Sequence, residues 1–470
     1  MNRSTCTGQT SAPERHRQAC SLKGSERSQG SERSLSIASS LGFSSSDAMD
    51  PSSTDRVLRK CRLLVVKSTE RCNLNCSYCY MYNGGDQSYL SRPPVMSMQT
   101  ARKMFERVDA HCRRHNIREF AFVLHGGEPL VAPPKYYREF VASARELIDS
   151  GVNLRFALQT NGTLMDEAWC DAFKELGIKI SFSLDGPAKV NDAFRVDRKG
   201  RGSFDRVMAG WRIAESQGIR PGLLMVIDPG SDPAEVYDLI KKLNPSTADF
   251  LFPDATHDKP SLAAKSASSP TPYADWLLQV FKLWTFDGEH APNIRLFLQL
   301  MRSMIGGNYG YDVLGQGDIE VLVIESDGEI QPLDGLRFCE DGLANTPYSV
   351  YTHALDDAYA HDLIATYHDS HSRLCTTCSN CRVKSVCGGG FLAHRYARAS
   401  GFDNPSVYCQ DLYKLISHLY DWLSPRLPAR ERARLVDLSR GSTPEVLGEK
   451  PVSRRFVAIR NASANQHGHS

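Results

Sequence analysis

The sequence lacks both a marked excess of one charge and any long apolar segment. Its 470 residues carry 56 Lys and Arg against 54 Asp and Glu, a formal net charge of +2, which gives no reason to expect binding to nucleic acid. No apolar run approaches the roughly 20 residues needed to cross a bilayer, and no apolar segment follows the basic residues near the start. We therefore expect a cytoplasmic protein with neither a nucleic-acid partner nor a membrane partner.

An export signal is also missing, which affects how the cysteines are interpreted. Fourteen cysteines in a chain without a signal peptide do not suit a disulfide framework, because the cytosol keeps thiols reduced. They indicate metal binding or catalysis instead. Hydrophobic residues make up 41% and charged residues 23% of the chain, which is typical of a globular protein with a sizeable core.

Composition divides the chain into a folded middle and two polar ends. Residues 1–55 are rich in Ser and Arg with almost no aromatic side chain, so we expect them to be disordered. Met49 lies just before the first strand-like run, and an over-extended start codon is one hypothesis for this segment. The other expected units are a core barrel (56–258), a helical connector (259–318), a cysteine-rich domain (319–424), and a helix with a polar tail (425–470).

Short β-branched or aromatic runs alternate with helical periodicity, the pattern of a parallel sheet covered by helices. The predicted strands are Arg62–Lys67, Phe120–His125, Leu154–Gln159, Lys179–Leu184, Gly222–Ile227 and Phe250–Phe252. The predicted helices between them are Met98–Arg114, Lys135–Asp149, Asp166–Leu176, Phe204–Gln217 and Asp232–Leu243. Six β/α units favour an α/β fold built on a partial TIM-type (β/α)6 barrel over an open doubly wound sheet. Later in the chain, Glu320–Gln331 is predicted to form a hairpin.

Three cysteines, Cys72, Cys76 and Cys79, follow the first predicted strand in the segment RCNLNCSYCY. Thiolates hold iron–sulfur clusters, and three on one loop can hold three irons of a cubane while the fourth iron stays open. The alternatives are a zinc site whose fourth ligand lies elsewhere, or three reduced structural thiols. The position at the end of a barrel strand, where barrel active sites lie, favours the cluster.

At this segment the sequence resembles the radical S-adenosylmethionine (SAM) enzymes. The resemblance implies a [4Fe–4S] cluster whose open iron binds SAM. It also implies cleavage of SAM to a 5′-deoxyadenosyl radical, with an external electron donor such as flavodoxin or ferredoxin as a partner. Further SAM contacts are implied at the ends of the following strands, in LHGGEPL, LQTNGT, SFSLDGP and NDAFR.

The resemblance assigns a role to residues in each of these segments. Gly126, Gly127 and Glu128 would receive the SAM ammonium, since glycines allow close approach and a carboxylate complements a cation. Ser183 and Arg195 would hold the SAM carboxylate. A plain turn for the glycines, a helix cap for the serine and a surface ion pair for the arginine are the structural alternatives. The remaining implied contacts are Gln159, Thr160 and Asn161 near the ribose and methionine, and Val226 at the adenine.

A second group of cysteines lies in LCTTCSNCRVKSVCGGGFLAHRYARASGFDNPSVYC. Zinc is the ordinary occupant of such clusters in cytosolic proteins. Beside a radical SAM core, however, the spacing resembles the SPASM extension, which carries auxiliary [4Fe–4S] clusters, and at least one is implied here. The cysteines that match this pattern are Cys378, Cys381, Cys387 and Cys409, with Cys375 as an extra candidate.

The sequence departs from the full SPASM pattern at the place of a second auxiliary cluster. Leu333 and Phe391 stand where that pattern has cysteines, whereas Cys339 keeps a cysteine. Cys339 is therefore either an ordinary thiol or a ligand recruited together with Cys375. Asp334 matches the acid that accepts a proton in SPASM-type sulfatase maturases as the substrate radical is oxidised, although Asp before Gly is also common in turns.

Three segments resemble the SPASM enzymes that modify ribosomal peptides, particularly those that form three-residue cyclophanes. These segments are CNLNCSYCYMYNGGDQSYLSRPPVMS, FLFPDATHDKP and VCGGGFLAHRYARASGFDNPSVYC. The resemblance implies abstraction of a β-hydrogen from a residue of a precursor peptide and coupling of the carbon radical to a nearby aromatic ring. A formylglycine-generating sulfatase maturase is one alternative, and a zinc-binding protein with no redox role is another.

Overall fold

The computed structural model describes residues 59–261, 269–307, 312–441 and 443. The segment 1–55 and the polar tail from residue 444 onward, about which the sequence made predictions, lie outside the described residues. All six predicted strands are present, and none of their ends differs from the prediction by more than two residues. They are β1 (Leu63–Thr69), β2 (Glu119–Gly126), β3 (Asn153–Thr160), β4 (Lys179–Ser183), β5 (Gly222–Val226) and β6 (Ala248–Leu251).

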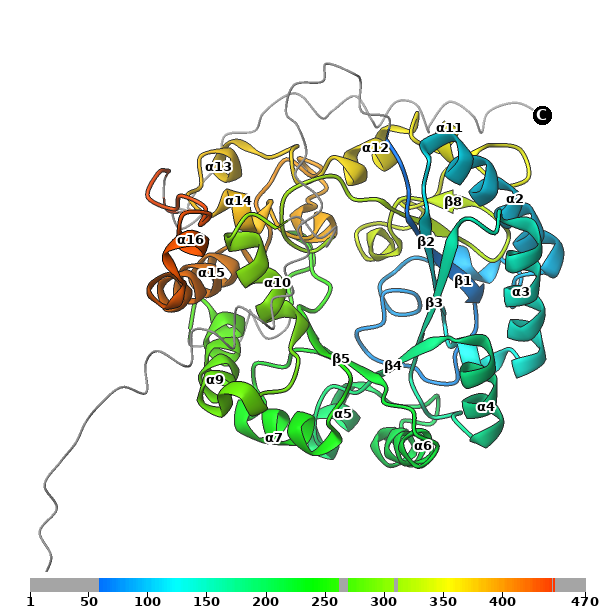
Figure 1. Ribbon diagram of the computed structural model, residues 1–470, viewed down its shortest axis with the longest axis horizontal. Helices are drawn as coiled ribbons and strands as arrows, with labels where there is room; N and C mark the ends of the chain where they lie inside the picture. The colour runs from blue at the N-terminus through cyan, green and yellow to red at the C-terminus, as the bar shows by residue number, and fades with distance from the viewer. Residues whose placement is uncertain (1–58, 262–268, 308–311, 442, 444–470) are drawn as a thin grey trace, which may run out of the picture.

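These six strands are parallel and lie side by side in the order in which they occur in the chain. A doubly wound sheet would reverse its strand order at one point. Here each strand pairs with its neighbours in sequence, which is the connectivity of a barrel wall. Figure 1 shows the strands as an arc with helices outside it. The predicted partial α/β barrel is therefore confirmed.

The outer helices also match the prediction within two residues at each end. α2 shows why its segment is helical. The side chain of Ser97 accepts a hydrogen bond from the Thr100 amide at the N-terminus, and Asn116 ends the helix in a left-handed conformation. Met104, Phe105 and Val108 share one face, are fully buried and pack on the sheet. The helices are α2 (Met98–His115), α3 (Pro134–Leu147), α4 (Glu167–Leu176), α6 (Phe204–Ser216) and α7 (Pro233–Leu243), with the short α5 (Ala188–Phe194) before α6.

The predicted hairpin is present, but it also joins the barrel sheet, which the sequence did not indicate. β7 (Val321–Ile324) is antiparallel to β8 (Ile330–Gln331) and parallel to β1, with Leu63 opposite Val321. The sheet therefore has eight strands, in the order β6-β5-β4-β3-β2-β1-β7-β8. This pairing brings the 3-10 turn η4 (Asp334–Phe338) beside the end of β1, where the first cysteine loop begins.

A buried ion cluster fixes that turn in place. Arg337 of η4 is fully buried, and its Nη2 lies 2.6 Å from Glu325 at the end of β7. Its Nη1 lies 3.9 Å from Glu70 at the end of β1. Removing this cation would leave Glu325 with only the more distant Arg92, whose Nε lies 3.9 Å away, and would take from Glu70 the cation that lies 3.9 Å from it. Breaking such a buried group costs about 3–5 kcal/mol. The cluster thus holds the cysteine loop and the hairpin in one arrangement.

After the six barrel strands most of the described elements are helices, and the two longest of them are α9 (Pro272–Asp287) and α15 (Cys409–Leu423). α15 packs against both α9 and α10 and buries Leu415, Ile416 and Leu419. The helices are α9 (Pro272–Asp287), α10 (Arg295–Met304), α11 (Leu355–Ala358), α12 (Asp362–His368), α13 (Thr376–Ser379), α14 (Lys384–Cys387), α15 (Cys409–Leu423) and α16 (Ala429–Arg432). The other 3-10 turns are η1 (Ser88–Leu90), η2 (Pro129–Val131), η3 (Gly288–His290), η5 (Leu392–Arg395) and η6 (Ser424–Arg426).

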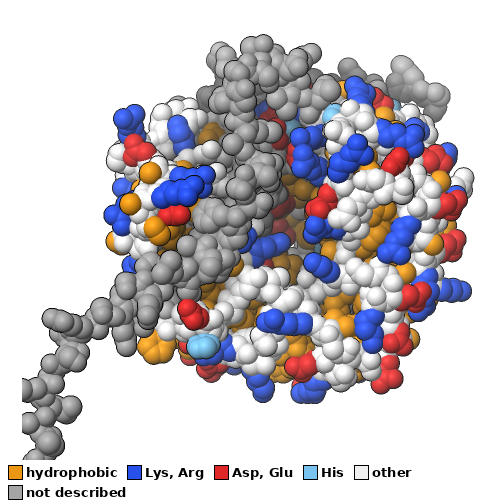
Figure 2. Space-filling model, in the orientation of Figure 1, with side chains coloured by type: hydrophobic (Ala, Val, Ile, Leu, Met, Phe, Trp, Pro, Cys, Tyr) orange, Lys and Arg blue, Asp and Glu red, His pale blue; other side chains and the backbone are white. Residues whose placement is uncertain are grey.

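Two surface properties agree with the composition. None of the helices in the described ranges combines the length and the apolar character that a bilayer crossing requires. On the face drawn in Figure 2, basic and acidic side chains are intermingled rather than separated into patches. That face of the described residues therefore has no extended surface of one charge.

Candidate active site

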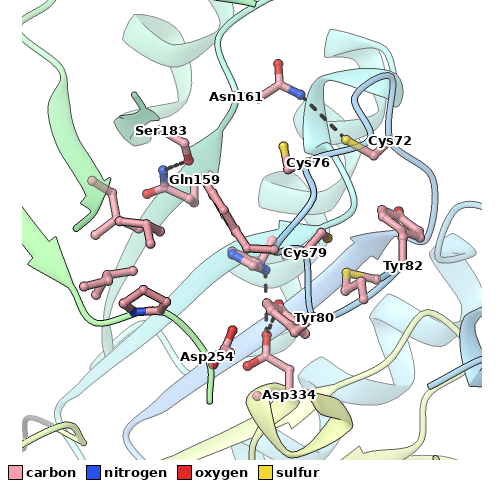
Figure 3. A pocket seen from close by; sticks show the side chains of 18 of the residues that line it. Cys72, Cys76, Cys79, Tyr80, Tyr82, Gln159, Asn161, Ser183, Asp254 and Asp334 are labelled. Carbon is pink, nitrogen blue, oxygen red and sulfur yellow. Dashed lines mark hydrogen bonds and ion pairs between the residues drawn. The ribbon is translucent and has the colours of Figure 1, made fainter. Parts of the chain in front are cut away.

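One cavity of about 290 Å³ opens at the carboxyl ends of the barrel strands, where the active sites of α/β barrels lie. It brings together every residue that the sequence predicted to hold the first cluster and SAM, and it also contains Asp334 (Figure 3). These residues are Cys72, Cys76, Cys79, Gly126, Gly127, Glu128, Gln159, Thr160, Asn161, Ser183, Arg195, Val226 and Asp334.

The three cysteines lie on the loop after β1, and all three line this cavity (Figure 3). The Cys79 amide donates to the Cys76 carbonyl at 3.0 Å, so these two cysteines share one turn. Burial raises the pKa of Cys72 to about 12 and that of Cys79 to about 11. A bound metal is what would hold such thiols as thiolates. Three thiols facing one cavity therefore fit a cubane with one open corner.

The paired glycines after β2 serve the contact with this loop. Gly126 has a φ of +137°, and a Cβ there would lie 2.0 Å from the Thr69 carbonyl oxygen. A Cβ at Gly127 would lie 2.4 Å from the Arg71 carbonyl oxygen. Only glycine allows the end of β2 to approach the cysteine loop this closely. Close approach of a ligand was the predicted role of these glycines, whereas the structure shows that chain packing already requires them.

Glu128 organises the ends of β2 and β3. Its carboxylate accepts hydrogen bonds from the Leu130 amide at 3.0 Å, the Thr160 hydroxyl at 2.6 Å and the Asn161 amide at 2.7 Å. Both carboxylate oxygens therefore already have protein donors, so Glu128 positions two strand ends whatever else it contacts. This positioning role was not predicted from the sequence.

Arg195 has a donor left for a ligand. Its Nη1 donates to the Tyr78 hydroxyl at 2.7 Å, and Tyr78 donates to Asp185 at 2.6 Å. Among the described residues, no group accepts a hydrogen bond from the buried Nε of Arg195, which is unfavourable unless an acceptor binds there. Close by in the cavity lining, Ser183 accepts from the Gln159 side chain at 2.7 Å, which leaves the serine hydroxyl free to donate. Both residues thus fit a bound carboxylate.

A buried lysine under the cavity was missed by the sequence analysis. Lys67 of β1 is fully buried, and its ammonium donates to the Tyr80 hydroxyl at 2.8 Å, to His125 Nδ1 at 3.1 Å and to Asp334 Oδ2 at 2.5 Å. Burial acts to raise the pKa of Asp334, but Lys67, with His125 and Tyr80, holds it below its ordinary value. A lone cation at the end of the apolar run LLVVK is the signal that could have identified this residue.

A second aspartate in the cavity, Asp254, was not among the predicted residues. It follows β6 and lies beside Asp334 (Figure 3). Burial, together with the negative charge of Asp334, raises the pKa of Asp254 to about 7. Its carboxylate has no hydrogen-bond donor among the residues that the structure describes. Because most of the other predicted contacts lie at or just after the end of a strand, the aspartate in FLFPD could have been found by the same rule.

Four cysteines of the second group line a separate, smaller cavity. They come from α13, from the turn after it, from the end of α14 and from the start of α15. Four thiols around one cavity suit either a [4Fe–4S] cluster or a zinc ion. The residues brought together are Cys378, Cys381, Cys387 and Cys409.

The two remaining candidate cysteines do not line that cavity. Cys375 lies against Cys378, whose thiol and amide hydrogen-bond its sulfur and lower the pKa of Cys375. The thiol of Cys339 donates to the Ala393 carbonyl at 3.6 Å inside an apolar cluster. Leu333 and Phe391 pack in that same cluster. At the two positions where the SPASM pattern has further cysteines, apolar side chains therefore pack instead.

Comparisons with known proteins support a radical SAM enzyme, the class that the segment around the cysteine triad resembles. Residues 66–243 match the Radical SAM superfamily. The curated relatives include the cysteine-type anaerobic sulfatase-maturating enzyme of Clostridium novyi (strain NT), which is 23% identical over 362 residues, covering 75% of this chain and 93% of that protein. The serine-type anaerobic sulfatase-maturating enzyme of Klebsiella aerogenes is 28% identical over 365 residues, covering 76% and 84%.

Solved structures agree with the fold. Native anSMEcpe with bound AdoMet has a TM-score of 0.66 and 21% identity, with 77% of this chain and 97% of that chain covered. Native anSMEcpe with bound AdoMet and Cp18Cys peptide has a TM-score of 0.66 and 20% identity, with 79% and 98% covered. These named relatives belong to the sulfatase-maturase alternative rather than to the cyclophane-forming enzymes.

Proposed function

We propose that this radical SAM enzyme oxidises a side-chain carbon of a peptide or protein segment by two electrons. The observation that carries the proposal is that the cysteine triad shares its cavity with a wall formed by Phe252, Pro253 and Phe391. Two carboxylates, those of Asp254 and Asp334, line the same cavity. That wall offers room and apolar contact for a side chain next to the proposed SAM site. The similarity to sulfatase maturases over most of their length also supports a polypeptide substrate.

In this proposal each part of the cavity has a task. Cys72, Cys76 and Cys79 hold the cluster, while Arg195 and Ser183 bind the SAM carboxylate. When both groups are bound and an external donor such as flavodoxin or ferredoxin supplies an electron, they provide a 5′-deoxyadenosyl radical that removes a hydrogen atom from the substrate. The chain itself positions the substrate and shields the radical from side reactions.

The first candidate product is an aldehyde, as in the formylglycine of matured sulfatases. The relatives named above support it. The test is incubation of the reduced enzyme with SAM and the Cp18Cys peptide, followed by mass spectrometry and hydrazide trapping. Conversion of the peptide cysteine replaces sulfur by oxygen with loss of two hydrogens, and only the aldehyde forms a hydrazide adduct. A Cys76→Ala variant serves as the control without a cluster.

The second candidate product is a crosslink between a side-chain β-carbon and an aromatic ring of a precursor peptide. The aromatic wall of Phe252 and Phe391 favours it, because aromatic rings pack well on one another. A synthetic library of ten-residue peptides would test it, each with one Phe, Tyr or Trp followed within three residues by an aliphatic or polar residue. A crosslink removes two hydrogens, resists hydrazide and joins two side chains in the fragment spectrum.

We further propose that the second cysteine cavity holds an auxiliary [4Fe–4S] cluster, and that the described residues hold no other. Four thiols line it, whereas Leu333, Phe391 and Cys339 lie in an apolar cluster. Anaerobic iron and sulfide analysis distinguishes this from the zinc alternative. Replacing Cys72, Cys76 and Cys79 by Ala should remove about half of the iron and sulfide, because one of two equal clusters is lost. Zinc without sulfide in that variant would exclude the auxiliary cluster.

A further inference from the structure

The carboxylate that the family resemblance points to as a base, Asp334, is already committed to other partners. Its Oδ2 accepts from the Lys67 ammonium at 2.5 Å and from the Tyr80 hydroxyl at 2.6 Å. An acceptor that is paired with a buried cation and a second donor holds a proton weakly. Asp334 is therefore expected to stay negatively charged rather than to act as a proton acceptor.

Asp254 has the opposite environment in the same cavity. It lies beside Asp334 on the segment after β6 (Figure 3), and no cation or hydrogen-bond donor among the described residues faces its carboxylate. The titratable groups around it are Asp334 on η4, Cys339 after η4, His394 on η5 and Tyr408 just before α15. Burial lowers the pKa of His394 to about 3 and raises that of the Cys339 thiol. These neighbours keep one charge state near neutral pH, whereas Asp254 changes its own.

The position of Asp254 is tied to the second cysteine cavity. The Tyr408 hydroxyl donates to the Pro253 carbonyl at 2.7 Å, one residue before Asp254. The Tyr408 ring packs on Phe252 at 4.9 Å and on His394 at 4.9 Å between ring centres. Cys409, which follows Tyr408 in the chain, lines the second cavity. The segment that carries Asp254 is thus held by the residue next to a proposed ligand of the auxiliary cluster.

We propose that Asp254, rather than Asp334, is the catalytic base that takes a proton from the substrate when the substrate radical is oxidised. This inference rests on the proposed function and adds the residue that completes it. The fixed charge of Asp334 makes Asp254 a better acceptor, since a neighbouring negative charge favours the protonated form. Sequence position also agrees, because Asp254 lies on the segment that follows β6, at the end of the barrel where active sites lie.

The hydrogen atom removed from the substrate Cβ ends in 5′-deoxyadenosine. The remaining radical then loses one proton to the Asp254 carboxylate and one electron to the auxiliary iron–sulfur cluster. The aldehyde precursor or the carbon–carbon bond forms in that step, and the substrate has lost two hydrogens in total. Asp254 and Cys409 lie on segments in contact, so the proton and the electron leave toward the same side of the cavity.

The test compares wild type with Asp254→Asn, Asp254→Glu and Asp334→Asn as anaerobically reconstituted holoenzymes, with SAM and the Cp18Cys peptide as the probe. We expect Asp254→Asn to form product about 100-fold more slowly, the size of a lost general base. Formation of 5′-deoxyadenosine should stay within about two-fold, because hydrogen abstraction precedes the proton transfer. Asp254→Glu should recover part of the rate. The rise of wild-type kcat with pH through about 7 should be absent from Asp254→Asn.

A second readout needs no turnover. Infrared difference spectra of the full-length protein between pH 8 and pH 6 should contain a protonated-carboxyl band that Asp254→Asn removes. Asp334→Asn should keep this band but move its appearance to lower pH, because the neighbouring negative charge is gone. The assignment is overturned if wild type converts the peptide and Asp334→Asn, rather than Asp254→Asn, is the variant that forms product slowly while it still forms 5′-deoxyadenosine. If wild type converts no peptide, the proposed function fails, and the infrared titration still decides whether Asp254 takes up a proton near neutral pH.

Discussion

Replacing Asp254 by Asn should stabilise the protein, and the gain should grow with pH. An ordinary aspartate has a pKa of 3.8, and the cavity raises that of Asp254 to about 7. Between these values the folded chain keeps a proton that the unfolded chain has lost. Wild-type stability therefore falls as pH rises through this window and is constant above it. Asn carries no charge in either state and avoids this loss.

The size of the effect follows from the same shift. A rise from 3.8 to about 7 corresponds to about 4 kcal/mol at about 1.4 kcal/mol for each pH unit. Because the carboxylate faces an open cavity, solvent screens part of its charge, and we expect about half of that value. The advantage of Asp254→Asn over wild type should therefore grow by about 1–2 kcal/mol between about pH 4.5 and about pH 8.

Thermal unfolding followed by circular dichroism under anaerobic conditions measures this difference. In a chain of this length, 1 kcal/mol moves Tm by about 2 °C or less, so the gap between variant and wild type should widen by about 2 °C over the pH range. Asp258→Asn, at an exposed aspartate of the same segment, is the matched control. A gap that stays constant, or that narrows as pH rises, would refute the reasoning.

Three further predictions concern the rest of the cavity. Cys76→Ala should abolish the first cluster and 5′-deoxyadenosine formation, whereas the control Cys170→Ala, at a buried core thiol of α4, should keep both, as seen by iron analysis and chromatography. Lys67→Met should destabilise the fold by about 3–5 kcal/mol, measured by urea unfolding, because Asp334 loses its buried cation; an unchanged midpoint would contradict the network. Glu128→Gln should cost about 2 kcal/mol and weaken SAM binding in calorimetry, since an amide cannot accept from all three donors; unchanged affinity and stability would contradict its organising role.

The sequence was informative about the barrel because its information there is local. Alternation of β-branched runs with helical periodicity located six strands and five helices within two residues of their ends. Once the strands were placed in parallel order, the residues after each strand had to meet at one edge. That rule brought the cysteine triad together with Gln159 and Ser183, which are distant in sequence. Arg195, which follows α5 rather than a strand, came from the family resemblance alone.

What sequence reasoning missed depends on contacts between distant segments. No local pattern states that β7 pairs with β1, and without that pairing Asp334 has no defined neighbour. The Lys67 ammonium acquires its meaning only when Tyr80, His125 and Asp334 surround it. The charge states of two aspartates in one cavity likewise follow from burial and proximity, which spacing along a chain does not specify.

The most direct test of the account is whether the reduced protein cleaves SAM. The full-length chain, reconstituted with iron and sulfide without air, is mixed with dithionite and SAM, and the nucleoside products are separated by chromatography. We predict 5′-deoxyadenosine from wild type and none from Cys76→Ala. Cluster-loaded wild type that yields no 5′-deoxyadenosine would contradict the assignment of the cavity as a SAM-cleaving site.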